Sequence, residues 1–212
     1  MPTWSPSPIW AGEDAFIIGG GPSIRSFDFN LLKKRNVIGV NDAFRLGPSI
    51  VSYVLFGDAG FWRENMRALE GCGMPVVTCA PSLAFINVPW LYQMGRMKDG
   101  LHTGPVLGWN YSTGAAAVNL ALTFGASRIF LLGFDMGKQE DGRSHWHDHR
   151  HKIIPNDSYE RFIQGFRSVK AGMVDYPDRR VYNVTDGSSR LPVFEKISFD
   201  VFKAVLAEGA PS

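Results

Sequence analysis

The stretch from Tyr111 to Asp135, YSTGAAAVNLALTFGASRIFLLGFD, limits what this chain can fold into more than any other part of the sequence. It opens on Ser112-Thr113-Gly114 and continues with small residues, which predicts a short helix whose first amides can be capped by a hydroxyl or can bind an anion. Gly125 stands where a helix ends in a left-handed residue. The apolar run that follows is continuous, as in a parallel strand covered on both faces. The stretch therefore predicts a helix and a buried strand of an α/β sheet.

Polar residues follow three of the predicted strands. Asp135 comes directly after the strand just described, at the edge of an open α/β sheet where ligands bind. A first strand over 14–19 runs into Gly19-Gly20-Gly21-Pro22-Ser23, whose glycines allow a ligand to approach the main chain closely. A second strand over 36–40 ends at Asn41 and Asp42, roughly 20 positions beyond the glycine turn, where nucleotide-binding folds place a ribose contact.

The remaining segments continue the alternation of strands and helices. Strands are predicted at 51–56, 74–79 and 180–184, and helices at 27–34, 61–69, 157–173 and 199–206. The helix over 157–173 has an apolar stripe that is expected to be core, and Asp157 with Glu160 resembles a capping box. The alternation predicts an α/β fold: a single Rossmann-like domain with a mostly parallel sheet and helices on both faces.

Three segments lie outside this alternation. Residues 1–12 contain three prolines and are predicted to form an extended leader anchored by Trp4 or Trp10. Residues 81–110 are rich in Gly, Pro and aromatic residues and are expected to be irregular, with a short strand near 87–91, and to form a lid or a plain surface loop. Residues 136–156 are expected to form a polar, histidine-rich loop.

Composition limits the classes of function. The 212 residues are enough for one sizeable core, so the whole of 1–212 is expected to be one nucleotide-binding domain. A formal net charge of +2 lacks the broad basic field of nucleic-acid-binding proteins. No window resembles a membrane span or a secretory signal, which favours a cytoplasmic protein with no membrane partner. Cys72 and Cys79 do not form a CxxC pair and fit free thiols in a reducing compartment.

Two of these motifs support a nucleotide-binding hypothesis, and each also has a plainer interpretation. The glycine turn is an incomplete GxGxxG, because Ile24 stands where the third glycine would be, and it lacks the GK[ST] of a P-loop. It can be a simple strand-to-helix connection. Ser112-Thr113-Gly114 can likewise be an ordinary helix cap. Because both motifs are predicted at the same sheet edge, binding of a phosphate or a carboxylate is the sharper hypothesis.

The histidine-rich loop carries a cluster of titratable residues. His145, His147, His149 and His151 alternate with other residues, so in an extended chain their side chains share one face roughly 6.5 to 7 Å apart. Three explanations stay open: a metal site formed by His145, His147 and His149, a general acid or base at His147 or His149, and a solvated loop. Arg143, Arg150 and Lys152 favour an anionic substrate.

Two aspartates at strand ends have alternative roles. Asp58 and Asp135 can hold a magnesium ion, contact a sugar or cap local turns. For Asp58 the cap is the favoured interpretation, and for Asp135 a functional role is favoured.

Taken together, these motifs resemble a superfamily with two characterised branches, the bacterial family-42 sialyltransferases and the 6-hydroxymethylpterin diphosphokinase-like proteins. A group of small tailed-phage proteins of unassigned function is more similar still, because it pairs GGGPS with an HWHxxH-like segment, here His145 to His149. The resemblance extends to Asn183 and to residues 188–194. A phage origin would place the protein in the host cytoplasm, and both enzyme branches imply that homo-oligomers can form.

The resemblance implies roles for particular residues. In the sialyltransferase branch the matching motifs surround a cytidine nucleotide sugar, which implies nucleotide binding by Gly21, Ser23, Asn41, Thr113 and Gly114. A loop histidine acts there as general base, and His147 or His149 is the nearest match. In the pterin branch ATP and Mg²⁺ would serve instead, with Asp58 and Asp135 as metal contacts.

The sequence therefore predicts a nucleotide-dependent transferase, with a glycosyltransferase that uses a nucleotide-activated sugar and an unknown acceptor as the first hypothesis. The alternatives are an ATP/Mg²⁺-dependent diphosphokinase-like enzyme and a non-catalytic nucleotide-binding phage accessory protein. The predicted contacts to the nucleotide or substrate are Gly19, Gly20, Gly21, Ser23, Asn41, Asp42, Asp58, Ser112, Thr113, Gly114, Asp135, Arg143 and Arg150.

Overall fold

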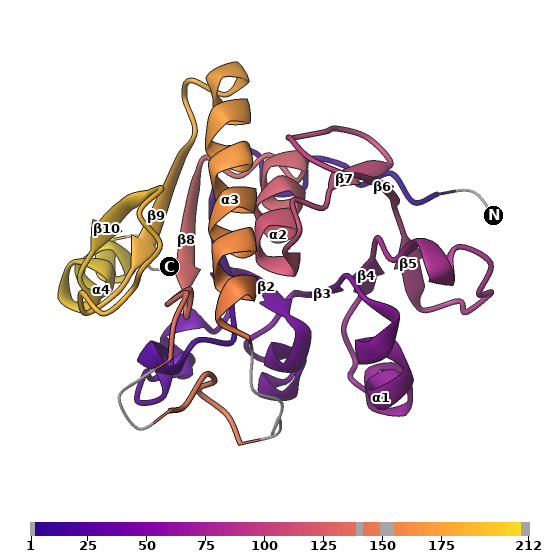
Figure 1. Cartoon of the computed structure of the whole chain (residues 1–212), viewed down its shortest axis with the longest axis horizontal. Coiled ribbons are helices and arrows are strands. Elements are labelled where there is room, and N and C mark those ends of the chain that lie inside the picture. The colour runs from indigo at the N-terminus through magenta and orange to yellow at the C-terminus, as the bar shows by residue number, and fades with distance from the viewer. Residues whose placement is uncertain (1–2, 139–141, 149–154, 209–212) are drawn as a thin grey trace.

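The computed structural model describes residues 3–138, 142–148 and 155–208. A parallel sheet of eight strands lies at its centre, and Figure 1 shows how the elements are arranged. The strand order is β10-β9-β8-β1-β2-β3-β4-β5, and every pair of neighbours is parallel. The strands are β1 (Asp14–Ile18), β2 (Asn36–Val40), β3 (Tyr53–Phe56), β4 (Val76–Thr78), β5 (Leu91–Gln93), β8 (Arg128–Leu132), β9 (Arg180–Val184) and β10 (Glu195–Ile197). Two further short strands, β6 (Gly95–Met97) and β7 (Val106–Gly108), pair with each other in parallel.

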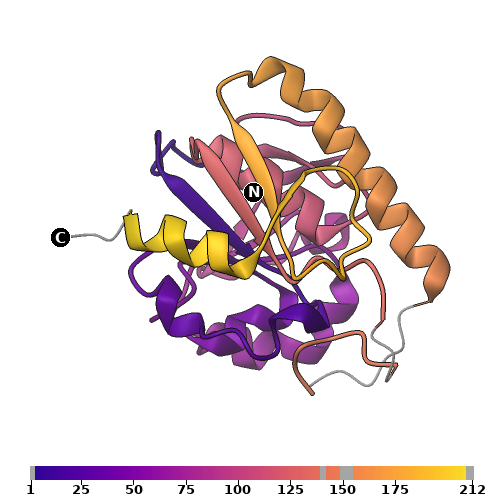
Figure 2. The ribbon, with the colours of Figure 1, turned by 90° about the vertical axis from the view of Figure 1, so that its left-hand side faces the viewer.

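Helices cover both faces of the large sheet, as Figure 2 shows. On one face, α2 (Thr113–Thr123) and α3 (Asn156–Gly172) pack on side chains such as Ile17 and Leu131. On the other, α1 (Ala59–Glu70) and α4 (Phe199–Glu208) pack on the alternate side chains of the same strands, such as Phe16 and Phe130. Strands buried on both faces require continuous apolar runs, and this is the pattern of the sequence. The predicted α/β class, with a mostly parallel sheet and helices on both faces, is confirmed.

The order of the strands places a crevice at one edge of the sheet. From β1 the chain adds β2 to β5 on one side, and it then returns to add β8, β9 and β10 on the other side. Ile18 of β1 is paired with Leu132 of β8, so the two strands end at the same level. The carboxyl ends of β1 and β8 thus flank the point where the strand order reverses, which is where open α/β sheets bind ligands.

One predicted helix is wrong. Residues 27–34 form only a 3₁₀ helix at Phe29–Leu32, which Asp28 caps by accepting hydrogen bonds from the backbone N and the side-chain Nδ2 of Asn30, at 3.0 and 2.8 Å. Lys34 then has a φ of 60°, which ends any helix. The crossover from β1 to β2 is therefore made of short turns. Other short 3₁₀ helices are Pro22–Ile24, Asn41–Leu46, Pro81–Leu83 and Met173–Asp175.

Residues 81–110 are more ordered than the sequence suggested, because they contain β5, β6 and β7. The strand expected near 87–91 starts only at Leu91, since Pro89 cannot donate a hydrogen bond to a ladder. Two buried asparagines fix the end of the segment. Asn119 of α2 bonds the backbone of His102 and Gly108, and Asn110 bonds both backbone groups of Gly100.

The other boundaries agree closely with the prediction, with one correction. α3 begins at Asn156, so Asp157 lies inside its first turn and does not form the expected capping box with Glu160. In the leader, Trp10 stacks edge-on against Phe124 at 4.5 Å between ring centroids, and the Trp4 amide donates to the Gln93 carbonyl at 2.7 Å. Cys72 and Cys79 are free thiols. Among the described residues, none of the helices is both long enough and apolar enough to span a bilayer.

Candidate functional site

A cavity of about 410 Å³ lies at the carboxyl ends of β1, β2, β3 and β8, where it also meets the start of α2, the first turns of α3 and the histidine-rich loop. Its size is within the usual range for small-molecule sites. The following predicted site residues line it: Gly19, Gly20, Gly21, Asn41, Asp42, Asp58, Ser112, Thr113, Gly114, Asp135, His145 and His147. Residues far apart in the sequence therefore meet around one cavity.

Two predicted site residues, Ser23 and Arg143, do not belong to this lining, and two more lie outside the described residues. Ser23 lies behind the wall, where its backbone amide donates to Asp135 Oδ2 at 2.9 Å. Arg143 is exposed on the loop and does not line the cavity. His149 and Arg150 lie outside the described residues, as do His151 and Lys152.

The glycine turn is a packed junction between β1 and the segment after β8. A Cβ atom on Gly21 would lie 2.3 Å from Asp135 Oδ2 and 2.6 Å from the Gly133 carbonyl oxygen. The φ of Gly21 is −64°, so its conformation is open to any residue. The glycine at this position is thus required by the close approach of two chain segments, and the same contact sets the Asp135 carboxylate against the turn.

Asp135 is a buried carboxyl group with one unused oxygen. The residue is 6% exposed, and Oδ1 has no hydrogen-bond partner among the described residues. Burial raises the pKa of Asp135, the hydrogen bonds from Ser23 oppose this, and Asp186 adds to the rise. A buried polar atom without a partner is unfavourable, and this one belongs to a residue that lines the cavity.

Tyr159 is a site residue that sequence analysis missed, because it belongs to the apolar stripe of α3 that was assigned to the core. The structure places it in the core cluster and also on the cavity wall, with a buried hydroxyl that has no partner among the described residues. Burial, and then the Asp135 charge, raise the pKa of Tyr159. Its position in the first turn after the histidine-rich loop was the available signal, since this places it at the carboxyl edge of the sheet.

Asn41 occupies the tip of β2 with a backbone φ of 51°, a left-handed value that is uncommon for residues other than glycine. Its side-chain Oδ1 is buried without a partner among the described residues. Tyr111 and Met136 have similar values, 55° and 52°, and both also line the cavity. Such backbone conformations persist where the surroundings enforce them, and they gather at functional sites.

The start of α2 presents backbone amides to the cavity. The Ser112 hydroxyl caps the helix by accepting from the Ala115 amide at 3.5 Å. Thr113 and Gly114 are the first two helical residues, and amides at these positions have no acceptor within their own helix. The helix dipole adds a partial positive charge at the same place, so this wall suits an anionic group.

Asp58 acts as a helix cap. Its carboxylate accepts from the Phe61 amide at 2.8 Å at the start of α1, and the side chain is exposed at the cavity rim. Trp109, which the sequence did not single out, lines the wall beside it. The Arg96 guanidinium lies 4.0 Å from the Trp109 ring centroid, and a Cβ on Gly57 would overlap that ring.

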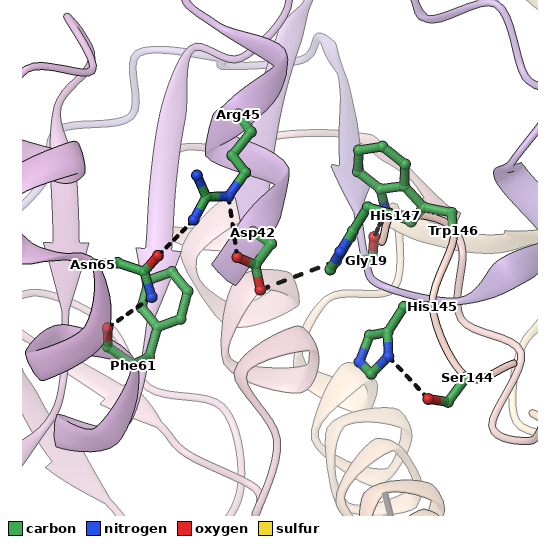
Figure 3. Close-up of polar contacts among 9 residues, drawn as sticks. All are labelled: Gly19, Asp42, Arg45, Phe61, Asn65, Ser144, His145, Trp146 and His147. Carbon is green, nitrogen blue, oxygen red and sulfur yellow. Dashed lines mark hydrogen bonds and ion pairs between the residues drawn. The ribbon is translucent and has the colours of Figure 1, made fainter. Parts of the chain in front are cut away.

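The loop histidines are held by the tryptophan between them. The Trp146 indole Nε1 donates to the Gly19 carbonyl at 2.9 Å (Figure 3), and the Trp146 amide donates to the Gly20 carbonyl at 3.0 Å. His145 and His147 both face the cavity, with ring centroids 5.3 Å apart. The expected alternation is therefore present in this pair. His147 is 8% exposed, and its Nε2 lies 4.0 Å from Asp42 Oδ2.

A metal site is not supported by the described residues, because no group of three His, Cys, Asp or Glu side chains among them can hold an ion. The predicted set of His145, His147 and His149 stays a prediction, since His149 lies outside those residues. Asp58 and Asp135 take part in a cap and in a contact with the glycine turn, and these interactions occupy one oxygen of each carboxylate.

Comparison with known proteins bears on the fold. No family model matches the sequence, and no curated protein matches it. The sialyltransferase CstII from Campylobacter jejuni, in complex with the substrate analogue cytidine-5'-monophosphate, has a TM-score of 0.55 at 13% identity over 88% of this chain and 85% of its own. Its complex with CMP-3FNeuAc has a TM-score of 0.51 at 12% identity over 87% and 85%. This chain is thus similar in fold to a bacterial sialyltransferase.

Proposed function

We propose that this protein is a nucleotide-dependent transferase, and specifically a glycosyltransferase that uses a nucleotide-activated sugar. The observation that carries the proposal is the convergence of the glycine turn, the start of α2 and His147 on one cavity. The fold similarity to a sialyltransferase over 88% of the chain supports the same class of reaction. An anion site and a histidine in one cavity are the two groups that glycosyl transfer from a phosphate leaving group needs.

In this proposal the α2 amides bind the phosphate of the donor. The first amides of α2 and the helix dipole stabilise the negative charge that grows on the phosphate as its bond to the anomeric carbon breaks. His147 takes the proton from the acceptor hydroxyl as that oxygen forms the new bond to the same carbon. The products are the glycosylated acceptor, the released nucleotide and a protonated histidine, which then returns its proton to solvent.

The unpartnered buried groups supply hydrogen bonds to the rest of the donor. The Tyr159 hydroxyl can donate to or accept from the hydroxyl and amide groups of a nucleotide sugar, and Asn41 Oδ1 and an ionised Asp135 Oδ1 can accept from them. The energetic argument is that a ligand hydrogen bond removes the penalty of leaving these atoms unsatisfied in the free protein.

A thermal-shift panel tests the proposal against its rivals. Cytidine and uridine nucleotides, CMP-sialic acid, UDP-glucose and ATP are each added with Mg²⁺ and with chelator. We expect a pyrimidine nucleotide to stabilise the protein with or without chelator, and its sugar conjugate to be turned over. Stabilisation by ATP that requires Mg²⁺ would favour the diphosphokinase-like alternative. Nucleotide binding without turnover of any sugar conjugate would favour a non-catalytic binding protein.

A Tyr159→Phe variant tests the geometry of the site. Because the hydroxyl has no partner among the described residues, its removal should leave the stability of the free protein unchanged or raise it. Binding of the stabilising nucleotide should weaken by about tenfold, measured by calorimetry. Tyr182→Phe is the matched control, because Tyr182 stacks on Phe130 on the far face of the sheet. Equal affinities in the two variants would exclude Tyr159 from the binding site.

A further inference from the structure

A row of polar side chains links His147 to α1 through Asp42, Arg45 and Asn65 (Figure 3). Asp42 Oδ2 lies 4.0 Å from His147 Nε2, and Asp42 Oδ1 accepts from Arg45 Nε at 3.4 Å. Arg45 Nη2 in turn donates to Asn65 Oδ1 at 2.8 Å, and Asn65 Nδ2 donates to the Phe61 carbonyl at 3.0 Å. These side-chain contacts thus connect His147 to the backbone of α1.

Three members of this row are buried. Asp42, Asn65 and His147 are 5%, 7% and 8% exposed. A buried carboxylate is unfavourable unless charged or hydrogen-bonding groups surround it, so the presence of Asp42 at this depth needs an explanation. Arg45 supplies part of the compensation. The remaining oxygen of Asp42 faces the imidazole, which becomes a partner of opposite charge whenever it is protonated.

The backbone enforces this placement of Asp42. The left-handed conformation of Asn41 turns the chain sharply at the end of β2 and begins the 3₁₀ helix Asn41–Leu46, in whose first turn Asp42 lies. His147 is fixed independently from the other side, because the neighbouring Trp146 is bonded to the glycine turn. Two separate anchors therefore bring the carboxylate and the imidazole together.

We propose that Asp42 is the positioning residue for His147, an inference that rests on the proposed role of His147 as general base. The carboxylate lies on the Nε2 side of the ring, fixes the orientation of the ring and stabilises the imidazolium formed when the ring takes a proton. Arg45 and Asn65 hold Asp42 in turn. His145 is a further titratable neighbour of His147, and its protonation would oppose that of His147.

The test uses Asp42→Asn, Asp42→Glu and a matched control, Asp148→Asn. Asp148 is next to His147 in the sequence, but its side chain is 83% exposed and pairs with Arg25 at 3.5 Å, so its substitution removes one negative charge without touching the row that contains Asp42. The first readout is the ring N–H signal of His147 in the ¹⁵N–¹H spectrum of histidine-labelled protein, with and without CMP. The protein is dialysed against chelator first, and the signal is assigned by its loss in His147→Gln.

The ring N–H of His147 should be visible in the wild type and in Asp148→Asn, and lost in Asp42→Asn, where no carboxylate protects it from exchange with water. Asp42→Glu should restore it in part. With the nucleotide sugar that is turned over, Asp42→Asn should lower kcat by at least about 100-fold while the KM for the donor changes by less than about threefold. A His147 signal or a kcat unchanged in Asp42→Asn would overturn the proposal. A protein that turns over no sugar, yet loses the signal in Asp42→Asn, would contradict the proposed function and leave the positioning role in place.

Discussion

Asp42 and Asp135 each follow a strand of the same sheet and line the same cavity, but their surroundings are opposite. Asp135 lies against the glycine turn, where its described hydrogen-bond partner is a backbone amide and its second oxygen is unused. Asp42 lies between a guanidinium and an imidazole, in a chain of side chains that reaches α1. The two aspartates therefore have the same place relative to the sheet but different hydrogen-bond and charge partners.

This difference shows what the strand-end position does and does not determine. The carboxyl edge of a parallel sheet brings such residues to one place, and that step follows from topology alone. Which of them touches a ligand and which adjusts a neighbouring group depends on loops that pack on that edge from elsewhere in the chain. Three substitutions test the contrast.

The largest loss of stability is expected from Gly21→Ala, which changes the contact between the glycine turn and Asp135. A Cβ atom there would lie 2.3 Å from Asp135 Oδ2 and 2.6 Å from the Gly133 carbonyl oxygen, so the turn and the segment after β8 would have to separate. We expect the free energy of unfolding to fall by about 2 to 3 kcal/mol, measured by urea denaturation. The loss of close packing at a junction of two central strands is the cause.

Gly71→Ala is the control for this substitution. Gly71 has a φ of −90°, and a Cβ atom there would meet nothing within 4 Å. Its substitution should change the free energy of unfolding by less than about 0.5 kcal/mol. Equal losses of stability in the two variants would show that the turn has room for a Cβ atom at Gly21. The close contact between Gly21 and Asp135 would then be wrong.

Removal of the cationic partner of Asp42 should destabilise the protein. Arg45→Leu removes the guanidinium 3.4 Å from Asp42 Oδ1 and leaves a buried carboxylate less well compensated. Because the Arg45 side chain is 34% exposed, solvent weakens the effect, and we expect a loss of about 1 to 2 kcal/mol in chemical denaturation. Arg25→Leu, which breaks the exposed pair with Asp148, should cost under about 0.5 kcal/mol.

A double substitution separates the effect of the Asp42 charge from the other contacts of Arg45. In an Asp42→Asn background the carboxylate is absent, so Arg45→Leu should lose at least half of its effect. If Arg45→Leu destabilises both backgrounds equally, Arg45 stabilises the protein through its hydrogen bond to Asn65 or through its aliphatic stem. The ion pair between Arg45 and Asp42 would then contribute nothing to stability.

Much of this fold could be predicted from sequence because strong local patterns agree with the tertiary structure. β2 and β9 have the predicted bounds, since their apolar runs are short and are delimited by polar residues. The helix predicted over 27–34 failed for a local reason, because Lys33 has an extended ψ of 138° and Lys34 a left-handed φ of 60°. β10, a three-residue edge strand, has too little sequence to carry a pattern.

The location of the site could be predicted from the sequence, but the contacts between its side chains could not. Strand ends and the start of α2 could be placed at one edge from topology alone. The approach of Asp42 to His147 could not, because it depends on how the loop that contains Trp146 packs on the glycine turn, more than 100 positions away in the sequence. Tyr159 was missed for a related reason. Tyr159 belongs both to the apolar stripe of α3 and to the lining of the cavity, and periodicity detects only the first.

The smallest of the three effects should be a change in pH dependence at Asp135. Burial raises the pKa of its carboxyl group in the folded protein above the ordinary value of an aspartate, although the Ser23 hydrogen bonds oppose the rise. The folded state thus keeps this proton at a pH where the unfolded chain has lost it. Ionisation of Asp135 therefore removes stability as the pH rises from the unfolded pKa through the folded pKa.

Asp135→Asn cannot ionise, so it isolates this contribution. Urea denaturation of both proteins from about pH 4 to about pH 7 cancels the other titrating groups, and the stability of the wild type relative to the variant should fall as the pH rises through this range. A relative stability that is constant or rises would mean that the folded protein stabilises the Asp135 carboxylate. In that case Asp135 would resemble Asp42, whose charge has a cationic partner, and the contrast between the two strand ends would not hold.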